Sequence, residues 1–242
     1  MKILDNIKSK LISGDKYWIV FTGDSITSCE WVHPNWRDIL IYVLQSEMIG
    51  KLNGDWKTVE WGLRGFNFAY DGSTTKDILE KMDDILGLKP QLIIGLMGGN
   101  DPVMNISVSE SVANISKIVE IALNNGSSIL WCNSIPSGER SPKNDEYRPY
   151  ARAFMEIPEK TGLGKIDMFN IYKNFPLEKF FTFLSEEIPL ENIKEGDLDL
   201  QHPNQLGNAY IAKVILKEYF GIEFNPERYI SDTNQGLKYP GY

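Results

Sequence analysis

The sequence is poor in the residues that build disulfide-rich proteins and metal sites. It contains only two cysteines, Cys29 and Cys132, and two histidines among 242 residues. These numbers argue against a disulfide framework, and no cysteine or histidine spacing is typical of a metal site. Cys132 lies in an apolar run and is expected to be a buried thiol. Cys29 is either buried as well, or lines a site around the nearby Ser25.

Long hydrophobic runs and an excess of positive charge are also missing. No apolar stretch approaches the length of a membrane span, and residues 1–8 mix charged with apolar side chains, unlike a cleaved signal peptide. We therefore expect a cytoplasmic protein, although a phage product or a non-classical export route would look the same. The net charge of −8 argues against a nucleic-acid or anionic-membrane partner and is expected mainly to favour solubility.

Two widespread catalytic motifs are absent as well. The chain has no Walker-type loop that would cradle phosphates, and no G-x-S-x-G turn of the kind that carries the nucleophile in α/β-hydrolases. An ATP-hydrolysing P-loop and the α/β-hydrolase fold are therefore both disfavoured.

Strand-like and helix-like patterns alternate along the sequence, which indicates a parallel sheet with helices on both faces. We predict a three-layer α/β/α fold in one domain, residues 1–242, with an irregular tail over about 222–242. The tail either packs on this domain or helps an oligomer contact. The five predicted strands are 17–21, 58–63, 91–97, 128–133 and 165–169. The helices between and after them are predicted at 35–50, 73–87, 107–126, 147–160 and 204–220.

Four short segments carry the residues that acyl transfer needs. They read GDSIT at 23–27, NFAYDGSTT at 67–75, GGND at 98–101 and DLQH at 199–202. The first three follow strand-like runs, and ligands of parallel α/β sheets bind at the carboxyl ends of the strands. Together they offer a hydroxyl nucleophile, a histidine base with a nearby carboxylate, and donors for an oxyanion.

In order and flanking residues, the four segments resemble the SGNH (GDSL-like) hydrolase family. The resemblance extends over most of the chain and implies the family's flavodoxin-like fold. It also implies a serine esterase that works through an acyl-enzyme and needs no cofactor and no metal. It leaves the oligomeric state open.

Each candidate site residue has a predicted role. Ser25 is the nucleophile, His202 is the base, and Asp199 orients His202. The oxyanion is expected to bind the backbone N–H groups of Ser25 and Gly72 and the side-chain amide of Asn100. Three neighbouring residues have other expected roles: Asp24 and Asp101 support their loops, and His33 is a loop residue unless it lines the mouth of the cleft.

The expected substrate is a small-molecule or carbohydrate ester, and an acetyl group on a carbohydrate is favoured. Trp31 and Trp36 could stack on a sugar ring, although Trp36 also fits the apolar stripe of its helix. The aromatic segment 175–183 is either ordinary core or a lid over a longer acyl chain. A lysophospholipase or thioesterase therefore remains an alternative, as does a non-catalytic carbohydrate-binding module on the same fold.

Overall fold

The computed structural model describes residues 3–28, 32–139, 141–187 and 194–242. Five parallel strands form one sheet in the order β2-β1-β3-β4-β5. The strands are β1 Tyr17–Gly23, β2 Leu63–Asn67, β3 Leu92–Met97, β4 Ser128–Asn133 and β5 Leu163–Ile166. The predicted five-stranded α/β fold is confirmed.

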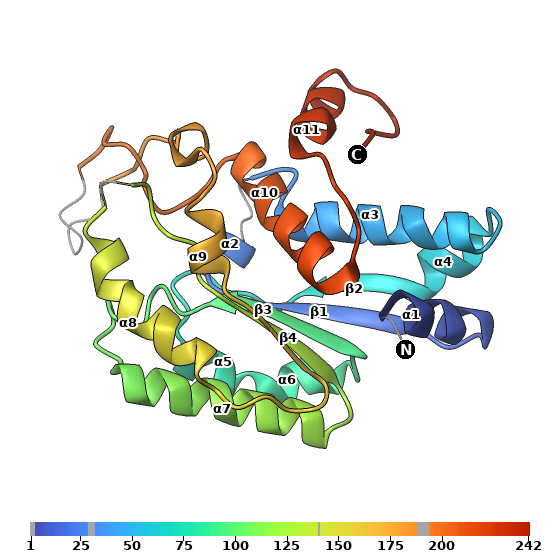
Figure 1. The fold of residues 1–242 in the computed structure, drawn as a ribbon, viewed down its shortest axis with the longest axis horizontal. Helices are drawn as coiled ribbons and strands as arrows, with labels where there is room; N and C mark the ends of the chain where they lie inside the picture. Colours follow the sequence, from blue (N-terminus) through green and yellow to red (C-terminus); the bar gives the residue numbers. More distant parts are fainter. Residues whose placement is uncertain (1–2, 29–31, 140, 188–193) are drawn as a thin grey trace.

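Helices cover both faces of the sheet (Figure 1). One apolar core lies between the sheet and a first group of helices: α1 Ile3–Ile12, α3 Trp36–Lys51, α9 Met168–Tyr172 and α10 Gln205–Ile215. The other core is formed with a second group on the opposite face: α5 Thr75–Glu80, α6 Met82–Gly87, α7 Val108–Asn124 and α8 Lys143–Met155. The remaining helical segments are α2 Ser25–Ser28, α4 Trp56–Gly62, η1 Leu177–Lys179, η3 Leu216–Phe220 and α11 Pro226–Asn234.

The central strands are apolar on both faces because each face packs against helices. Every residue of β3 is buried, and such two-sided burial is typical of parallel strands. Gly95 in β3 leaves room for the ring of Trp131 on the neighbouring strand, since a Cβ at this position would lie 2.8 Å from the ring. The core thus fixes how β3 and β4 lie together, and both end at the edge where the site forms.

The strand predicted at 58–63 is wrong. Residues 56–62 form helix α4, and β2 starts only at Leu63. The Asp55 side chain accepts a hydrogen bond from the Thr58 amide and caps the helix. Val59 is the buried residue of this helix. The residues predicted as one strand therefore belong to the end of a helix, up to Gly62, and to the first residue of a strand, Leu63. The register of β2 against β1 pairs Leu63 with Tyr17.

Other helices match the predictions with shifted ends. α3 starts at the predicted cap, Asn35, which forms a full capping box with Asp38. The helix predicted at 73–87 is divided at Lys81 into α5 and α6. The helix predicted at 147–160 begins four residues earlier, at Lys143. The strand predicted at 165–169 is β5, Leu163–Ile166.

The end of the chain differs from the expectation of an irregular tail. Helix α11 occupies residues 226–234, with Asn225 as its cap and Pro226 in its first turn. Tyr229 of this helix is buried in the same core as α3 and α10. The proline and the polar residues, which suggested a loop here, instead begin a helix that packs through Pro226, Tyr229 and Ile230.

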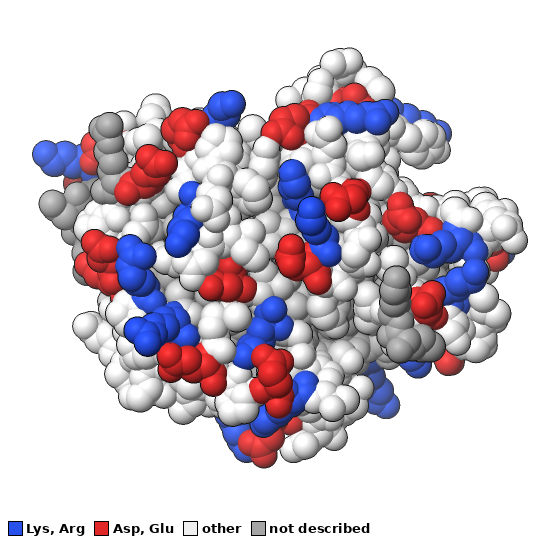
Figure 2. All heavy atoms as spheres, viewed as in Figure 1, with Lys and Arg blue, Asp and Glu red and all other residues white. Residues whose placement is uncertain are grey.

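Charged side chains of both signs are interspersed over the face shown in Figure 2. Among the described residues no helix is long and apolar enough to cross a membrane.

Candidate active site

A glycine turn places Ser25 at the carboxyl end of strand β1, which lies between β2 and β3. Gly23 ends the strand with a φ of 154°. A Cβ at this position would lie 2.2 Å from the carbonyl oxygen of Leu96 and 2.7 Å from the hydroxyl oxygen of Thr27. Only glycine allows the chain to turn so close to β3. Ser25 follows as the first residue of α2, with its side chain facing the site.

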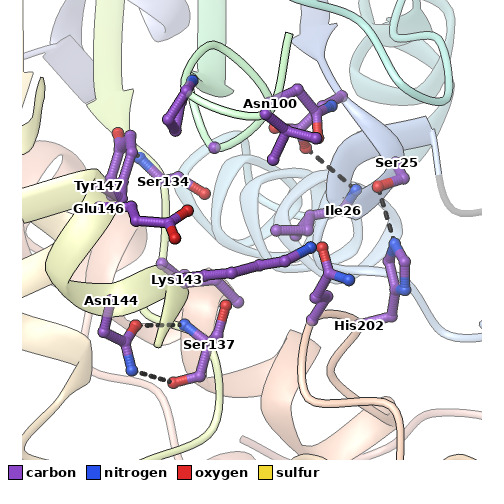
Figure 3. A pocket seen from close by; sticks show the side chains of 16 residues that line it. Ser25, Ile26, Asn100, Ser134, Ser137, Lys143, Asn144, Glu146, Tyr147 and His202 are labelled. Atoms are coloured by element: carbon purple, nitrogen blue, oxygen red, sulfur yellow. Dashed lines mark hydrogen bonds between the residues drawn. The ribbon is translucent and has the colours of Figure 1, made fainter. Parts of the chain in front are cut away.

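Ser25, His202 and Asp199 form a continuous chain of hydrogen bonds. The Ser25 Oγ lies 2.8 Å from His202 Nε2 (Figure 3). His202 Nδ1 lies 2.7 Å from Asp199 Oδ2. With its proton on Nδ1, the imidazole donates to the carboxylate and accepts from the serine hydroxyl. Residues 177 positions apart in the sequence therefore meet in the geometry that a serine nucleophile and its base require.

Local backbone contacts hold the aspartate and histidine in this arrangement. Asp199 Oδ1 accepts hydrogen bonds from the amides of Gln201, at 2.8 Å, and His202, at 3.0 Å. The carboxylate thus closes the turn with one oxygen and contacts the imidazole with the other. The spacing of three residues suffices because the loop itself brings the two side chains together.

Burial and charge act in opposite directions on this pair. Burial alone would raise the pKa of Asp199, but the hydrogen bonds and charge of His202 and two backbone amides hold it below its ordinary value. Burial alone would lower the pKa of His202, but its bond to Asp199 and the charges of Asp199, Asp24 and Asp71 raise it. The site therefore favours the imidazolium that forms when His202 takes a proton.

Asp24 supports the turn rather than the histidine. Its Oδ1 accepts a hydrogen bond from the Ile26 amide at 3.1 Å, and its backbone carbonyl accepts from Thr27 and Ser28. The side chain is buried, which raises the pKa of Asp24 to about 7. This agrees with the architectural role expected from the sequence.

The segments around Gly72 and Asn100 meet beside Ser25. Asn100 lines the same cavity as Ser25, and its Nδ2 donates to the Ser73 carbonyl at 3.0 Å. Asp101 is buried and accepts from both the amide and the hydroxyl of Thr75, as expected of a loop support. Gly72 has a φ of 71° and lies outside the described cavity lining, one residue before the Asn100 contact.

A buried pair of asparagines ties the serine turn to the histidine loop. Asn35 Nδ2 donates to the Ile26 carbonyl, at 3.3 Å, and to Asn208 Oδ1, at 3.1 Å. Asn208 Nδ2 in turn donates to the Pro203 carbonyl at 2.9 Å. Both side chains are fully buried. One hydrogen-bonded bridge therefore runs from the residue after Ser25 to the residue after His202.

The cavity at Ser25 is small and is lined by both polar and apolar groups. Its volume is about 50 Å³. Besides the predicted residues, it is lined by the first turn of α8 and the loop before it, which sequence reasoning missed. These additional lining residues include Ser134, Ser137, Lys143, Asn144, Glu146 and Tyr147. Figure 3 shows Lys143 and Glu146 pointing into the cavity from α8.

Several further expectations are decided by burial. Cys132 is fully buried, and burial raises its pKa. Trp36 is also fully buried and packs edge-on against Phe21, so its proposed contact with sugar is wrong. His33 is exposed in a loop with its Nδ1 4.0 Å from Asp38 Oδ2, and it lies outside the described cavity lining. Cys29 and Trp31 lie outside the described residues.

The aromatic segment 175–183 belongs largely to the core. Phe180 and Phe181 are buried, and Phe175 packs partly buried against the same cluster. Phe175 and Phe180 both contact Tyr210 of α10, with ring centroids 4.7 and 4.8 Å apart from it. Core is therefore the interpretation that the structure supports for these three rings.

No group of three or more histidine, cysteine, aspartate or glutamate side chains that could hold a metal ion is present in the described part of the chain.

Comparisons with known proteins identify the family. The model of the GDSL-like lipase/acylhydrolase family matches residues 21–210. A search of curated proteins gives no match. Among solved structures, the chain is similar to Axe2, an acetylxylan esterase from Geobacillus stearothermophilus. The two share 18% identity, with 86% of this chain and 96% of that chain covered and a TM-score of 0.61.

Two more solved structures have the same fold. A lipase/acylhydrolase from Enterococcus faecalis shares 19% identity over 85% of this chain and 96% of its own, with a TM-score of 0.60. TesA shares 16% identity over 82% of this chain and 95% of its own, with a TM-score of 0.54. At these identities the structures support the fold, while the family match covers most of the chain. The chain therefore belongs to the GDSL-like lipase/acylhydrolase family and is a carboxylic ester hydrolase.

Proposed function

We propose that this protein is a serine esterase in which Ser25, His202 and Asp199 form the catalytic triad. The observation that carries the proposal is the unbroken path from Ser25 Oγ to His202 Nε2, at 2.8 Å, and from His202 Nδ1 to Asp199, at 2.7 Å. A hydroxyl becomes a nucleophile when a base within hydrogen-bond distance takes its proton.

The reaction proceeds in two halves. Ser25 Oγ attacks the ester carbonyl while its proton passes to His202 Nε2. The tetrahedral intermediate then expels the alcohol, which receives that proton, and the acyl group stays on Ser25. In the second half, water attacks the acyl-enzyme and gives a proton to His202. The acid leaves when Ser25 takes this proton back, and the enzyme is restored.

The oxyanion of each intermediate is proposed to bind the backbone N–H groups of Ser25 and Gly72 and the Asn100 amide. Asn100 supports this role because it lines the cavity with Ser25, while its contact with the Ser73 carbonyl orients the amide. The amide group has two N–H donors, so one holds the loop and the other serves the substrate. Gly72 lies on the adjoining turn, next to Ser73.

The proposed substrate is a short-chain ester, most simply an acetyl ester of a carbohydrate. The cavity at Ser25 has a volume of only about 50 Å³. An acetyl group suits this space, and the polar groups of the lining suit a hydroxyl-rich alcohol. The acetylxylan esterase of similar fold makes acetylated carbohydrate a reasonable substrate class to test.

One observation favours the alternative, hydrolysis of longer acyl chains. A second cavity of about 350 Å³ lies beside the first and is lined by Leu177, Phe181, Leu198 and Leu200. The Gly138 amide donates to the Leu200 carbonyl at 2.8 Å. Both residues line the second cavity, and their chain neighbours Ser137 and Gln201 line the first. If that pairing opened, an acyl chain bound at Ser25 could extend over these leucines.

Labelling with a fluorophosphonate probe and a comparison of two aryl esters test the proposal. We expect wild-type protein to be labelled at Ser25 and to hydrolyse aryl acetate. The Ser25→Ala variant should lose labelling and about 10⁴-fold or more in kcat. Labelling of a natively folded Ser25→Ala variant would disprove the assignment of Ser25 as the nucleophile. A wild-type protein that is not labelled would favour the alternative of a non-catalytic binding module. A higher kcat/KM for aryl decanoate than for aryl acetate would favour the long-chain alternative.

A further inference from the structure

The first turn of α8 brings one charge of each sign into the cavity. Lys143 is the one lysine or arginine among the described residues that line it, and Glu146 lines it as well. They are three positions apart on the helix, so they lie on the same face. Figure 3 shows the Lys143 side chain crossing the cavity toward Ser25 and His202.

This turn of α8 is held firmly against the sheet. Asn144 accepts from the Ser137 amide at 2.9 Å and donates to the Ser137 and Gly138 carbonyls. Tyr147 is buried, and its hydroxyl accepts from the Ser134 amide at 2.8 Å, just beyond the end of β4. The residues next to Lys143 and Glu146 thus fix where these two side chains enter the cavity.

The pairing of a charged donor with a charged acceptor matches the chemistry of hydroxyl groups. A hydroxyl both donates and accepts, so Lys143 can donate to one hydroxyl while Glu146 accepts from a neighbouring one. A plain alkyl group would desolvate both charges without replacing their hydrogen bonds. An anionic group would be attracted by Lys143 but repelled by Glu146, and the chain already carries a net charge of −8.

We propose that Lys143 and Glu146 determine specificity by binding adjacent hydroxyls on the alcohol half of the ester. This inference rests on the proposed esterase function, in which His202 delivers its proton to the leaving alcohol. The alcohol must therefore lie near His202, on the side toward which Lys143 extends. The substrate class that follows is an ester of a polyol or sugar with two adjacent free hydroxyls beside the acylated position.

A pair of matched esters tests this specificity directly. Glycerol 1-acetate and propyl acetate share the acyl group and the three-carbon primary alcohol, and differ only in two hydroxyls. The measured quantity is the ratio of their kcat/KM values. We expect wild type to prefer glycerol 1-acetate, and the ratio to fall about tenfold or more in Lys143→Met and in Glu146→Gln.

The same helix offers matched controls. Asp145 and Arg148 are exposed on α8 and pair with each other at 2.9 Å, outside the described cavity lining. Asp145→Asn removes a negative charge next to Glu146, and Arg148→Met removes a positive charge about one and a half turns from Lys143. Both controls should keep the wild-type ratio. Thermal unfolding of all four variants checks that the fold is retained.

Three outcomes would overturn the inference. The first is an unchanged ratio in both Lys143→Met and Glu146→Gln. The second is an equal fall in kcat/KM for both esters, which would mean that these residues act on the reaction itself and do not recognise the hydroxyls. The third is a loss in Lys143→Met confined to O-acetyllactate, which would mean that Lys143 binds an anion. A wild type that is inactive on both esters and unlabelled by fluorophosphonate would instead refute the esterase function itself, and the inference would fall with it.

Discussion

Among single residues, Asn100 offers a sharp test of the oxyanion site. It contributes a side-chain amide to the cavity, held by the Ser73 carbonyl. We expect Asn100→Ala to lower kcat for aryl acetate by roughly 10²–10³-fold, about 3–4 kcal/mol of barrier, with little change in KM. Asn100→Asp should be at least as damaging, because a carboxylate repels the developing negative charge.

The control for Asn100 is Val103→Ala, which alters the same cavity without removing a polar donor. Circular dichroism and thermal unfolding should show native protein for all three variants. Full activity in folded Asn100→Ala would reduce Asn100 to a turn residue.

The pH dependence of the rate reports on His202. Burial lowers the pKa of His202, but Asp199 and the nearby carboxylates more than reverse this effect. Since the base must be neutral, kcat/KM should rise with pH through a midpoint above the usual histidine value of about 6.5. In Asp199→Asn the largest of the interactions that raise the His202 pKa is lost while burial still lowers it, so the midpoint should move to lower pH. The kcat should fall by about 10⁴-fold. An unmoved midpoint in Asp199→Asn would contradict this assignment.

Asp24 should make stability depend on pH. Folding raises the pKa of Asp24 from 3.8 to about 7, so the folded protein favours the protonated carboxyl. The resulting cost is absent below the unfolded pKa and grows as the pH rises through the folded pKa. Asp24→Asn stays neutral and can still accept from the Ile26 amide. Denaturant unfolding should therefore show that this substitution raises the free energy of unfolding more at pH 8 than at pH 5, by up to about 4 kcal/mol. An equal gain or loss at both pH values would rule out this titration.

At the level of elements, the turn from β1 into α2 depends on Gly23. A Cβ there would meet the Leu96 carbonyl, a backbone atom that cannot rotate away. We expect Gly23→Ala to lower the free energy of unfolding by about 2 kcal/mol or more. Gly50, inside α3 with nothing within 4 Å of an added Cβ, is the matched control. Gly50→Ala should stabilise the protein by about 0.5–1 kcal/mol in the same urea titration. Similar values for both substitutions would mean that the turn can rearrange.

Elements marked by a continuous apolar run were predictable from the sequence, and elements whose limits depend on tertiary contacts were not. The apolar runs at 91–97 and 128–133 gave β3 and β4 almost to the residue. By contrast, the run at 58–63 contains both a helical stripe around Val59 and the start of a strand at Leu63. Only the pairing of Leu63 with Tyr17 decides where the helix stops. Such pairing has no local signal in the sequence.

The candidate site divides in the same way. The segments that carry Ser25, Gly72 and Asn100 were recognisable because each combines a chemical group with a turn that follows a strand. The fourth segment was recognisable because Asp199 lies three residues before His202. Their catalytic roles stay predictions. Lys143 and Glu146 had no such signal, because charged residues at the start of a helix are ordinary surface features. Their position in the cavity follows from the contacts of Asn144 and Tyr147 with the loop after β4.

For the molecule as a whole, the ability of Ser25 to be labelled should be lost at the same point as the global fold. Ser25 lies at the end of β1, whereas His202 directly precedes α10, and both elements contribute to one apolar core. Since α10 cannot leave this core without exposing several buried side chains, it should unfold with the sheet. Fluorophosphonate labelling and far-UV circular dichroism should therefore lose their native signals at the same urea concentration. Loss of labelling well before the dichroism signal would show that α10 detaches on its own.

The separation of 177 residues between the two bonded partners also has a consequence for biosynthesis. At about 5–20 residues per second, a ribosome needs about 9–35 s to advance from Ser25 to His202. Throughout that interval the nascent chain holds a serine with no base beside it, so it should be inert toward esters and toward covalent inhibitors. The enzyme thus acquires its reactivity only after His202 has been translated, and labelling by an activity-based probe would report that a nascent chain has passed this residue.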